Sequence, residues 1–205
     1  QAIYESEDLL LKHDLHYGQG MHTALDEAAY LVSFVAGLPP DFCPDKDNMC
    51  LSEHHKQRLQ ECLAKRIKQR LPLAYILGQT WLAGVMFKVS PAVLIPRSPI
   101  AELIGQQCSP WNQCQQVRHI LDLCTGSGCL GILAAQAFPE AHVDMSDIDQ
   151  AALKIAAQNI QLHRLSDRIN IICSDVYAQI PYTQYDIIIA NPPYVPVCEQ
   201  VQLPA

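Results

Sequence analysis

The sequence predicts an α/β protein: a doubly wound parallel sheet preceded by a small helical domain and a linking β-hairpin. Two observations carry this prediction. Up to about residue 78 the apolar residues recur at helical spacing. From residue 117 short apolar runs alternate with helical patterns, a rhythm typical of a parallel sheet because each crossover connection needs a helix. We therefore expect a helical domain over 1–78, a hairpin linker over 79–97 and the sheet domain over 98–205.

The expected elements follow in chain order. Residues 21–38 form a helix that ends at Gly37, before two prolines, and Ser52 is the N-cap of the next helix, whose buried stripe is Leu59, Leu63 and Ile67. Strand-forming residues with turns at Gly84 and Pro91 predict the hairpin. The rest is a short helix over 99–107, four strands over 120–123, 141–147, 168–173 and 185–190, and helices over 129–138 and 149–163. Because the chain ends soon after the fourth strand, we expect an excised fragment that lacks the C-terminal strands.

Composition excludes several classes of protein. With 49% apolar and 17% charged residues, the chain is neither disordered nor fibrous. No stretch approaches the ~20 apolar residues of a membrane span, and no signal-peptide pattern begins the sequence. The nine cysteines include no Cys-x-x-Cys pair, which favours reduced thiols over a zinc site. We expect a cytoplasmic protein with no metal and no membrane contact.

Charge is unevenly distributed. The formal net charge is −7, yet residues 51–100 hold 8 basic and 2 acidic side chains, whereas residues 101–205 hold 4 basic and 10 acidic ones. The basic side chains lie mainly between residues 56 and 70: Lys56, Arg58, Lys65, Arg66, Lys68 and Arg70. Such a stripe can steer the protein toward an anionic partner such as RNA. The alternative is the solvated face of an amphipathic helix.

A glycine-rich turn follows the first strand of the sheet. The segment from Asp122 to Cys129 reads Asp-Leu-Cys-Thr-Gly-Ser-Gly-Cys, and its glycines permit positive φ and close approach of a ligand to the backbone. A tight structural turn is the alternative. No lysine follows Gly128, and Gly131 falls one residue late for Gly-x-Gly-x-x-Gly, so a P-loop is excluded and a nicotinamide site is disfavoured. The turn favours an adenosine ligand without phosphates.

An acidic residue at the end of the second strand supports that ligand. Asp147 lies 19 residues after Gly128, close to the spacing at which a carboxylate meets ribose hydroxyls. Asp144 is the competing candidate, with a surface acid as its simpler role. Asp149 is better explained as a helix N-cap.

The tetrapeptide Asn191-Pro192-Pro193-Tyr194 follows the fourth strand. Two prolines fix φ and remove two N–H donors, so the carbonyls nearby remain free acceptors. Asn191 adds a side-chain acceptor and Tyr194 a planar face. This set suits a planar amide or amino nitrogen, whose two N–H groups need two acceptors while a ring stacks on it. A rigid turn at the end of the strand is the alternative.

The two motifs together resemble the class I methyltransferases that use S-adenosyl-L-methionine and methylate planar amide or amino nitrogens. Residues 73–78, 87–91 and 94–97 are similar to the HemK-like protein glutamine methyltransferases, and the last of these stretches is not shared by DNA adenine methyltransferases. Release-factor enzymes typically read Pro-Arg-Pro-Asp/Glu-Thr-Glu where this chain reads Pro-Arg-Ser-Pro-Ile-Ala from Pro96. That departure, with Cys124 in the glycine turn, is similar to the PrmB branch, whose substrate is ribosomal protein three of the large subunit.

The resemblance implies a Rossmann-like methyltransferase fold and a role for each matching residue. It implies cofactor contacts from Asp122, Cys124, Thr125, Gly126, Ser127, Gly128 and Asn191, with Asp147 on the ribose and Asp175 and Val176 on the adenine. Release-factor enzymes have a tryptophan in place of Val176. Asn191 and the Pro192 carbonyl would hold the glutamine amide, Tyr194 would pack on it, Pro193 would line the substrate side, and Arg97 would help to close the pocket. The catalytic residues would be Asn191, Pro192 and Tyr194.

Other functions remain open at this point. A release-factor glutamine methyltransferase shares most of the motifs. A nucleic-acid adenine amino-methyltransferase shares the tetrapeptide, although the acidic catalytic half of the chain disfavours it. A non-enzymatic alternative is a truncated cofactor-binding or ribosome-assembly module. A nicotinamide dehydrogenase is the weakest alternative, because it leaves the tetrapeptide unexplained.

Overall fold

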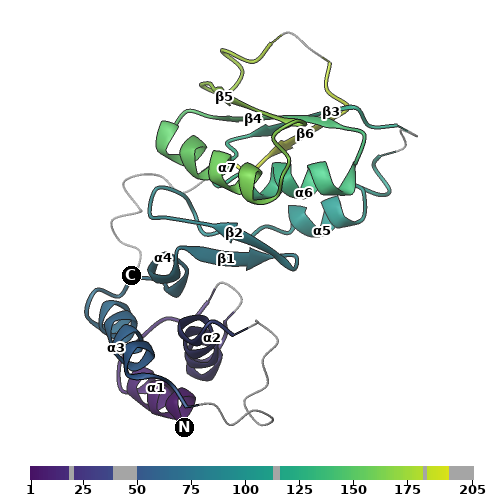
Figure 1. Cartoon of the computed structure of the whole chain (residues 1–205). Helices are drawn as coiled ribbons and strands as arrows, with labels where there is room; N and C mark the ends of the chain where they lie inside the picture. The colour runs from purple at the N-terminus through teal and green to yellow at the C-terminus, as the bar shows by residue number, and fades with distance from the viewer. Residues whose placement is uncertain (19–20, 39–49, 113–115, 182–183, 194–205) are drawn as a thin grey trace. The chain divides into compact units, whose positions relative to one another are not determined.

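The computed structural model describes residues 1–18, 21–38, 50–112, 116–181 and 184–193 (Figure 1). The chain divides after Leu77 into a helical unit and a sheet unit. Each unit has its own hydrophobic core.

The described residues of the helical unit form four helices. They are α1 (Ala2–Leu11), α2 (Ala24–Ala36), α3 (Glu53–Lys68) and α4 (Leu73–Leu77). The N-caps explain where the long helices begin. Thr23 and Asp26 form a reciprocal capping box, so α2 begins three residues later than the apolar pattern predicts, and Gly37 ends it in the left-handed conformation. Ser52 caps α3, as predicted, by accepting a hydrogen bond from the His55 amide.

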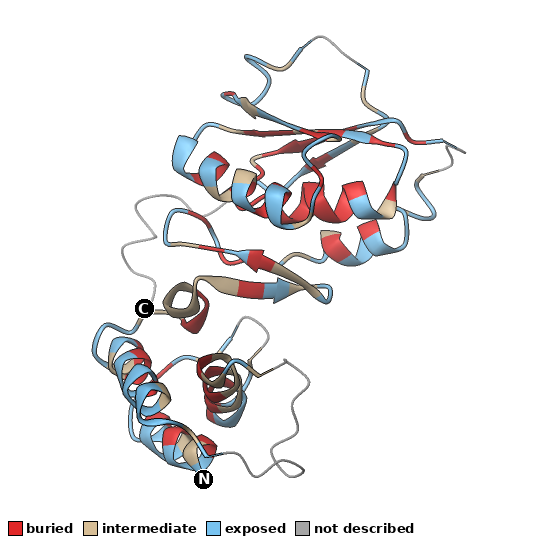
Figure 2. Cartoon of the chain, in the orientation of Figure 1, coloured by how far each residue is buried: buried red, intermediate tan, exposed pale blue. Residues whose placement is uncertain are grey.

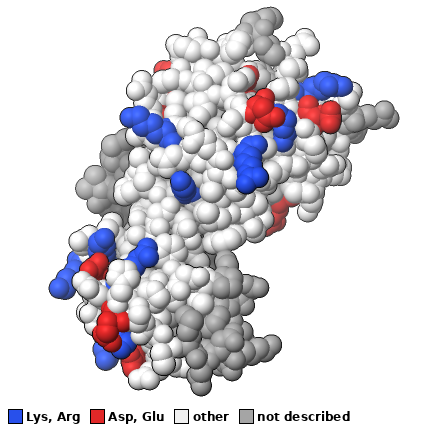
Figure 3. Space-filling view, in the orientation of Figure 1, with Lys and Arg blue, Asp and Glu red and all other residues white. Residues whose placement is uncertain are grey.

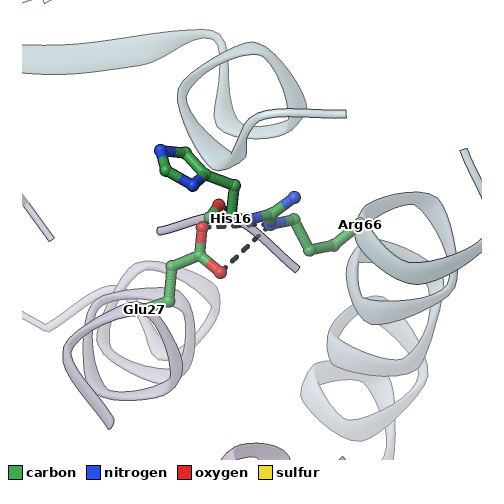
Figure 4. Close-up of polar contacts among 3 residues, drawn as sticks. All are labelled: His16, Glu27 and Arg66. Carbon is green, nitrogen blue, oxygen red and sulfur yellow. Dashed lines mark hydrogen bonds and ion pairs between the residues drawn. The ribbon is translucent and has the colours of Figure 1, made fainter. Parts of the chain in front are cut away.

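A buried ion pair joins α2 to α3 (Figure 4). Arg66 is 4% exposed, and its Nε donates to both carboxylate oxygens of Glu27 at 3.0 Å. The guanidinium also donates to the His16 carbonyl at 2.8 Å. Burial raises the pKa of the Glu27 carboxyl, whereas Arg66 opposes this effect. Removing either partner alone would leave an unpaired buried charge, so the pair fixes how these two helices meet.

The basic stripe of α3 is therefore smaller than the sequence predicts. Arg66 points into the core, the Arg58 guanidinium lies 5.2 Å from the centre of the Phe34 ring, and Lys56 pairs with Glu53. Figure 3 shows Lys and Arg along the α3 side of the helical unit with acidic side chains among them. The inclusion of Arg66 in an exposed stripe was wrong, because a helical pattern cannot reveal a partner 39 residues away.

The sheet unit begins with an antiparallel hairpin of β1 (Gln79–Leu82) and β2 (Val85–Lys88). The short helix α5 (Ile100–Gly105) follows. In the part of the chain that the structure describes, four parallel strands then form one sheet in the order β5-β4-β3-β6. They are β3 (His119–Leu123), β4 (His142–Asp147), β5 (Ile169–Cys173) and β6 (Ile187–Ala190), with α6 (Cys129–Ala137) and α7 (Gln150–Leu162) between them. Every predicted strand and helix of this unit is present, within a few residues of its expected bounds.

Helices α6 and α7 pack on the same face of the sheet (Figure 1). Both lie in connections that step in one direction, from β3 to β4 to β5, and crossovers between parallel strands share one hand as a rule, which brings both helices to the same face. Ile120 of β3 and Val143 and Met145 of β4 are fully buried. Figure 2 shows buried residues both in the strands and in the helices below them. The connection from β5 back to β6 contains no helix among its described residues, so the expected helices on both faces are described for one face only.

Two expectations from composition can be compared with the described residues. None of their helices is long and apolar enough to cross a membrane. The cysteines among them, at positions 50, 62, 108, 124, 129 and 173, are free thiols.

Candidate active site

The order of the strands places a reversal of winding at the carboxyl ends of β3 and β6. The chain winds from β3 through β4 to β5 and then returns to the other side of β3, so the direction of winding reverses between β3 and β6. Ligands of open parallel sheets bind at such a reversal, outside the carboxyl ends of the strands. In the register of the sheet, Leu123 pairs with Ala190. The glycine loop and the Asn191 segment therefore leave the sheet side by side, at the same edge.

The glycine loop has an alternating backbone. Cys124, Gly126 and Gly128 have φ values of +55°, +56° and +81°, all in the left-handed region. Nothing lies within 4 Å of the place where a Cβ on Gly126 would stand, so this glycine leaves open surface at the rim. A Cβ on Gly128 would instead lie 3.1 Å from the Cβ of Ala156. Gly128 is thus required by both its conformation and its packing against α7.

The side chains of the loop mostly face inward. Thr125 and Ser127 are 6% and 3% exposed, whereas Cys124 and Gly126 are partly exposed. The Thr125 amide donates to the Ser146 carbonyl at 2.9 Å, which holds the loop against the end of β4. A ligand at this edge therefore meets the backbone at Cys124 and Gly126 rather than the hydroxyl groups.

Asp122, for which the resemblance implies a cofactor contact, lies buried under the glycine loop. It is 1% exposed, and its Oδ2 accepts hydrogen bonds from the Thr125 hydroxyl and from the Gly131 amide at 3.0 Å. Burial raises the pKa of this carboxyl to about 7, in spite of both hydrogen bonds, and the charge of Asp147 adds to the rise. Asp122 thus holds the glycine loop through Thr125 and the start of α6 through Gly131, from the buried side of the loop.

Gly131, which falls one residue late for the dinucleotide pattern, has a packing role in the structure. It lies within α6, where a Cβ would approach the Met145 Cε to 2.5 Å and the Asp122 carboxylate to 3.0 Å. Its role is close contact between the helix and the sheet. A glycine inside a predicted apolar helix was the available sequence signal for this contact.

Asp147 lies at the rim, where it connects β4 to the glycine loop. Its Oδ2 accepts from the Gly126 amide at 2.9 Å and its Oδ1 accepts from the Asp149 amide at 3.0 Å. Asp149 caps α7 through the Ala151 amide, as predicted. The competitor Asp144 is bound instead by the Tyr185 hydroxyl and the Asn170 amide. Burial, and then the charges of Asp147, Asp122 and Asp175, raise the pKa of the Cys124 thiol, so it is kept neutral.

The next strand end contributes an exposed apolar surface. Val176, after β5, has φ +47°, which is rare for a β-branched residue, and it is 49% exposed. The carbonyl of Val176 accepts from the buried Ser174 hydroxyl at 2.9 Å, which keeps the turn in place. Asp175 is exposed beside it. Ile148, directly after Asp147, is 67% exposed, and the sequence analysis missed it because one apolar residue after a strand gives no periodic signal.

The substrate side of the predicted site is described only in part. Asn191, Pro192 and Pro193 are exposed directly after β6. Tyr194 lies outside the described residues. Arg97 is exposed as well, on the segment that follows the hairpin.

A second residue missed by the sequence analysis supports the loop from α7. Asn159 is fully buried and donates to the Ser127 carbonyl at 2.8 Å. It occupies an apolar position of α7, one turn after Ala156, and a polar residue at such a position was the available signal.

Two hollows lie away from this edge. One of about 250 Å³ is at the amino ends of the strands, beside Val117 and Phe138. The other, of about 540 Å³, is a groove of the helical unit along α1 and α3, lined by Leu9 and Leu59 among others. Neither contains a residue of the glycine loop.

The groups at the rim fit a nucleoside without phosphates. Asp147 offers carboxylate oxygens for hydroxyl groups, Ile148 and Val176 offer apolar surface, and Gly126 leaves open space beside the backbone. The four strand ends at 122–131, 147–149, 173–177 and 191–193 carry no Lys or Arg to neutralise a polyphosphate. These residues therefore fit S-adenosylmethionine, the cofactor that the sequence motifs imply.

Two family models match the chain. Residues 17–78 match the PrmC N-terminal domain, and residues 111–202 match the methyltransferase small domain. A solved structure, the SAM-dependent methyltransferase from Agrobacterium tumefaciens, is 24% identical with a TM-score of 0.45, over 56% of this chain and 39% of that one.

Curated relatives are considerably more similar. The ribosomal protein uL3 glutamine methyltransferases of Bordetella pertussis, Xylella fastidiosa and Francisella tularensis are 42%, 41% and 39% identical over 91%, 93% and 89% of this chain. The chain spans 63%, 61% and 59% of the lengths of these relatives, about three-fifths. Both domains and the sequence identity over nine-tenths of the chain lead to one conclusion: the chain belongs to the HemK-like family of class I methyltransferases.

Proposed function

We propose that the chain binds S-adenosylmethionine at the carboxyl rim of β3 and β4 and methylates a glutamine side-chain amide nitrogen of a large-subunit ribosomal protein. One observation carries the proposal: the pairing of Leu123 with Ala190, which brings the glycine loop beside Asn191. The names of the relatives support the choice of substrate, since each is called a ribosomal protein uL3 glutamine methyltransferase. Such a substrate implies a cytoplasmic reaction.

The proposed chemistry demands orientation more than a strong base. When bound, S-adenosylmethionine supplies an electrophilic methyl group on a sulfonium. The Asn191 side chain and the Pro192 carbonyl would accept the two N–H bonds of the substrate amide and so orient its nitrogen toward that methyl group. Pro193 would keep the segment rigid, and Tyr194, which lies outside the described residues, would supply the ring that the resemblance implies for the amide. The glycine-loop backbone and Asp147 would hold the nucleoside, and Asp175 and Val176 would contact the adenine. Arg97 closes the pocket from the hairpin side.

Isothermal titration and methyl transfer test the proposal together. The 205-residue chain is titrated with S-adenosylmethionine and then incubated with methyl-labelled donor and ribosomal protein uL3, a release factor or DNA in separate reactions. We expect saturable binding, with label on a glutamine of uL3 identified by mass spectrometry. Label on the release factor or on DNA would select one of the alternative substrates. Binding without transfer would identify a cofactor-binding module, and no binding would contradict the proposal.

The basic helix suggests an additional contact with RNA. Lys65, Lys68 and Arg70 are exposed on or directly after α3, and a substrate protein of the ribosome occurs beside RNA. The acidic residues on the same side of the unit favour the alternative, a solvated face. Charge reversal at Lys65 and Lys68 should weaken binding to ribosomal RNA and reduce its salt dependence if the contact is real.

A further inference from the structure

Asn159 is a fully buried polar residue on the apolar stripe of α7. Its neighbours on that stripe are small or apolar: Ala152, Leu153, Ala156 and Ile160. Burying a carboxamide costs free energy unless its donors and acceptor find partners. A leucine would fill a similar volume without this demand, so the partners of Asn159 are its distinguishing property.

The carboxamide of Asn159 bonds to two separate backbone segments. Its Oδ1 accepts from the Lys88 amide at 2.7 Å, and its Nδ2 donates to the Lys88 carbonyl at 2.9 Å. The amide thus gives the outer edge of β2 the same donor and acceptor that a neighbouring strand would provide. Its second N–H donates to the Ser127 carbonyl at 2.8 Å. Because the Lys88 N–H requires an oxygen, this bonding pattern fixes the orientation of the side chain.

Two residues near Asn159 on α7 and at its C-cap each contact only one of these two segments, the glycine loop or the hairpin. One turn before Asn159, Ala156 packs against Gly128 of the loop. One turn after it, the His163 ring nitrogen lies 2.9 Å from the Met86 carbonyl, and the His163 ring lies 5.3 Å from that of Phe87. Ala156 therefore contacts the loop and His163 contacts the hairpin, whereas Asn159 bonds to both.

We propose that Asn159 is a positioning residue that couples the β2 edge of the hairpin to the glycine loop, so that the conformation of the loop at Ser127 depends on the hairpin. The consequence for ligand affinity rests on the proposed function, because it takes the loop as the site of S-adenosylmethionine. The coupling is reciprocal. A ligand that orders the loop also stabilises the Lys88 pairing, and a displacement of the hairpin weakens the loop.

Two matched variants separate coupling from simple packing. Asn159→Leu keeps the volume and removes all three hydrogen bonds, whereas His163→Phe keeps the ring contact with Phe87 and removes only the bond to Met86. Amide hydrogen exchange is measured at Gly126 and Gly128, which bond to Asp147 and Thr125 and not to Asn159. We expect Asn159→Leu to speed exchange at both glycines at least tenfold, and His163→Phe to leave it within twofold.

Ligand binding provides the second measurement. Asn159→Leu should raise the dissociation constant of S-adenosylmethionine at least tenfold, and His163→Phe should leave it within twofold. Equal exchange at the glycines and equal affinity in both variants would overturn the proposal and leave Asn159 a packing residue. If Asn159→Leu does not fold, Asn159→Asp serves instead, since it keeps an acceptor for Lys88 and loses both N–H donors. If the parent chain binds no S-adenosylmethionine, the proposed function fails, while the exchange data still decide the coupling.

Discussion

The two segments at the rim of the sheet differ in how they are held. The glycine loop after β3 is fixed by Asp122 from below, by the Ser146 carbonyl and Asp147 from β4, and by Asn159 from α7. The segment after β6 is exposed from Asn191 to Pro193, and its rigidity comes from the two prolines. Tertiary contacts therefore hold the proposed cofactor side, whereas the proposed substrate side is restrained by the fixed φ angles of its two prolines. Changes on the two sides should affect different measurements.

The sharpest test of this comparison is Asn191→Ala. The side chain is exposed and lies after the end of the strand, so its loss should leave the fold and the glycine loop unchanged. We expect methyl transfer to fall at least about 100-fold, since one acceptor that orients the amide is removed. The dissociation constant of S-adenosylmethionine should stay within twofold of the parent value. A parallel loss of transfer and binding would show that Asn191 acts on the cofactor side.

Gly128→Ala should disturb the glycine loop, on the proposed cofactor side. The added Cβ would meet Ala156 at 3.1 Å in a left-handed backbone, so the loop must shift, and we expect a loss of about 1–3 kcal/mol of unfolding free energy. The affinity for S-adenosylmethionine should fall at least tenfold. Gly126→Ala is the control, because it has the same sign of φ with open space around the Cβ and should cost only about 1 kcal/mol. Urea unfolding and titration measure both effects, and equal costs would disprove the packing argument.

Asp122→Asn tests the support beneath the loop through its pH dependence. Because the folded pKa of Asp122 is raised to about 7, the folded state binds the proton more tightly than the unfolded state. The stabilising contribution of the protonated carboxyl is fully present below pH ~4 and is lost as the pH rises through about 7. The unfolding free energy of the parent should fall by up to about 1.4 kcal/mol per pH unit across this window.

The asparagine cannot ionise, yet its side-chain oxygen can still accept from Thr125 and Gly131. We therefore expect the variant to lack this decline in urea unfolding measured from pH 4.5 to 8. Parallel curves for the two proteins would mean that the Asp122 carboxyl is already ionised throughout the range.

The difference between the two sides also shows what the sequence could and could not predict. The strands and their carboxyl ends were predictable, since short runs rich in apolar residues, such as 187–190 and, apart from Asp122, 120–123, alternate with helical patterns, and the order of these strands in the chain sets the rim. The roles of Asp122 and Arg66 were not predictable. An acidic residue before a glycine turn suggests a ligand contact, but the structure shows Asp122 bonded to the Gly131 amide. A basic residue in a charged helix suggests a solvated side chain, but the structure shows Arg66 paired with Glu27. Asn159 carried a signal without revealing its partners.

The smallest expected effect belongs to Cys124. Among residues 124–128, three adopt the left-handed conformation, and Cys124 is the one of them that is not a glycine. Holding a side chain there costs about 1–2 kcal/mol, whereas a glycine loses more backbone freedom on folding, by roughly 0.5–1 kcal/mol. Cys124→Gly should therefore raise the unfolding free energy by about 0.5–1 kcal/mol and change the affinity for S-adenosylmethionine less than threefold, because the loop is held from Asp122, Asp147 and Asn159. Thermal unfolding and titration of the same sample measure both quantities. A large gain in affinity would mean that the Cys124 thiol restricts the ligand. It would also mean that the hydrogen bonds from Asp122, Asp147 and Asn159 do not by themselves set the conformation of the loop.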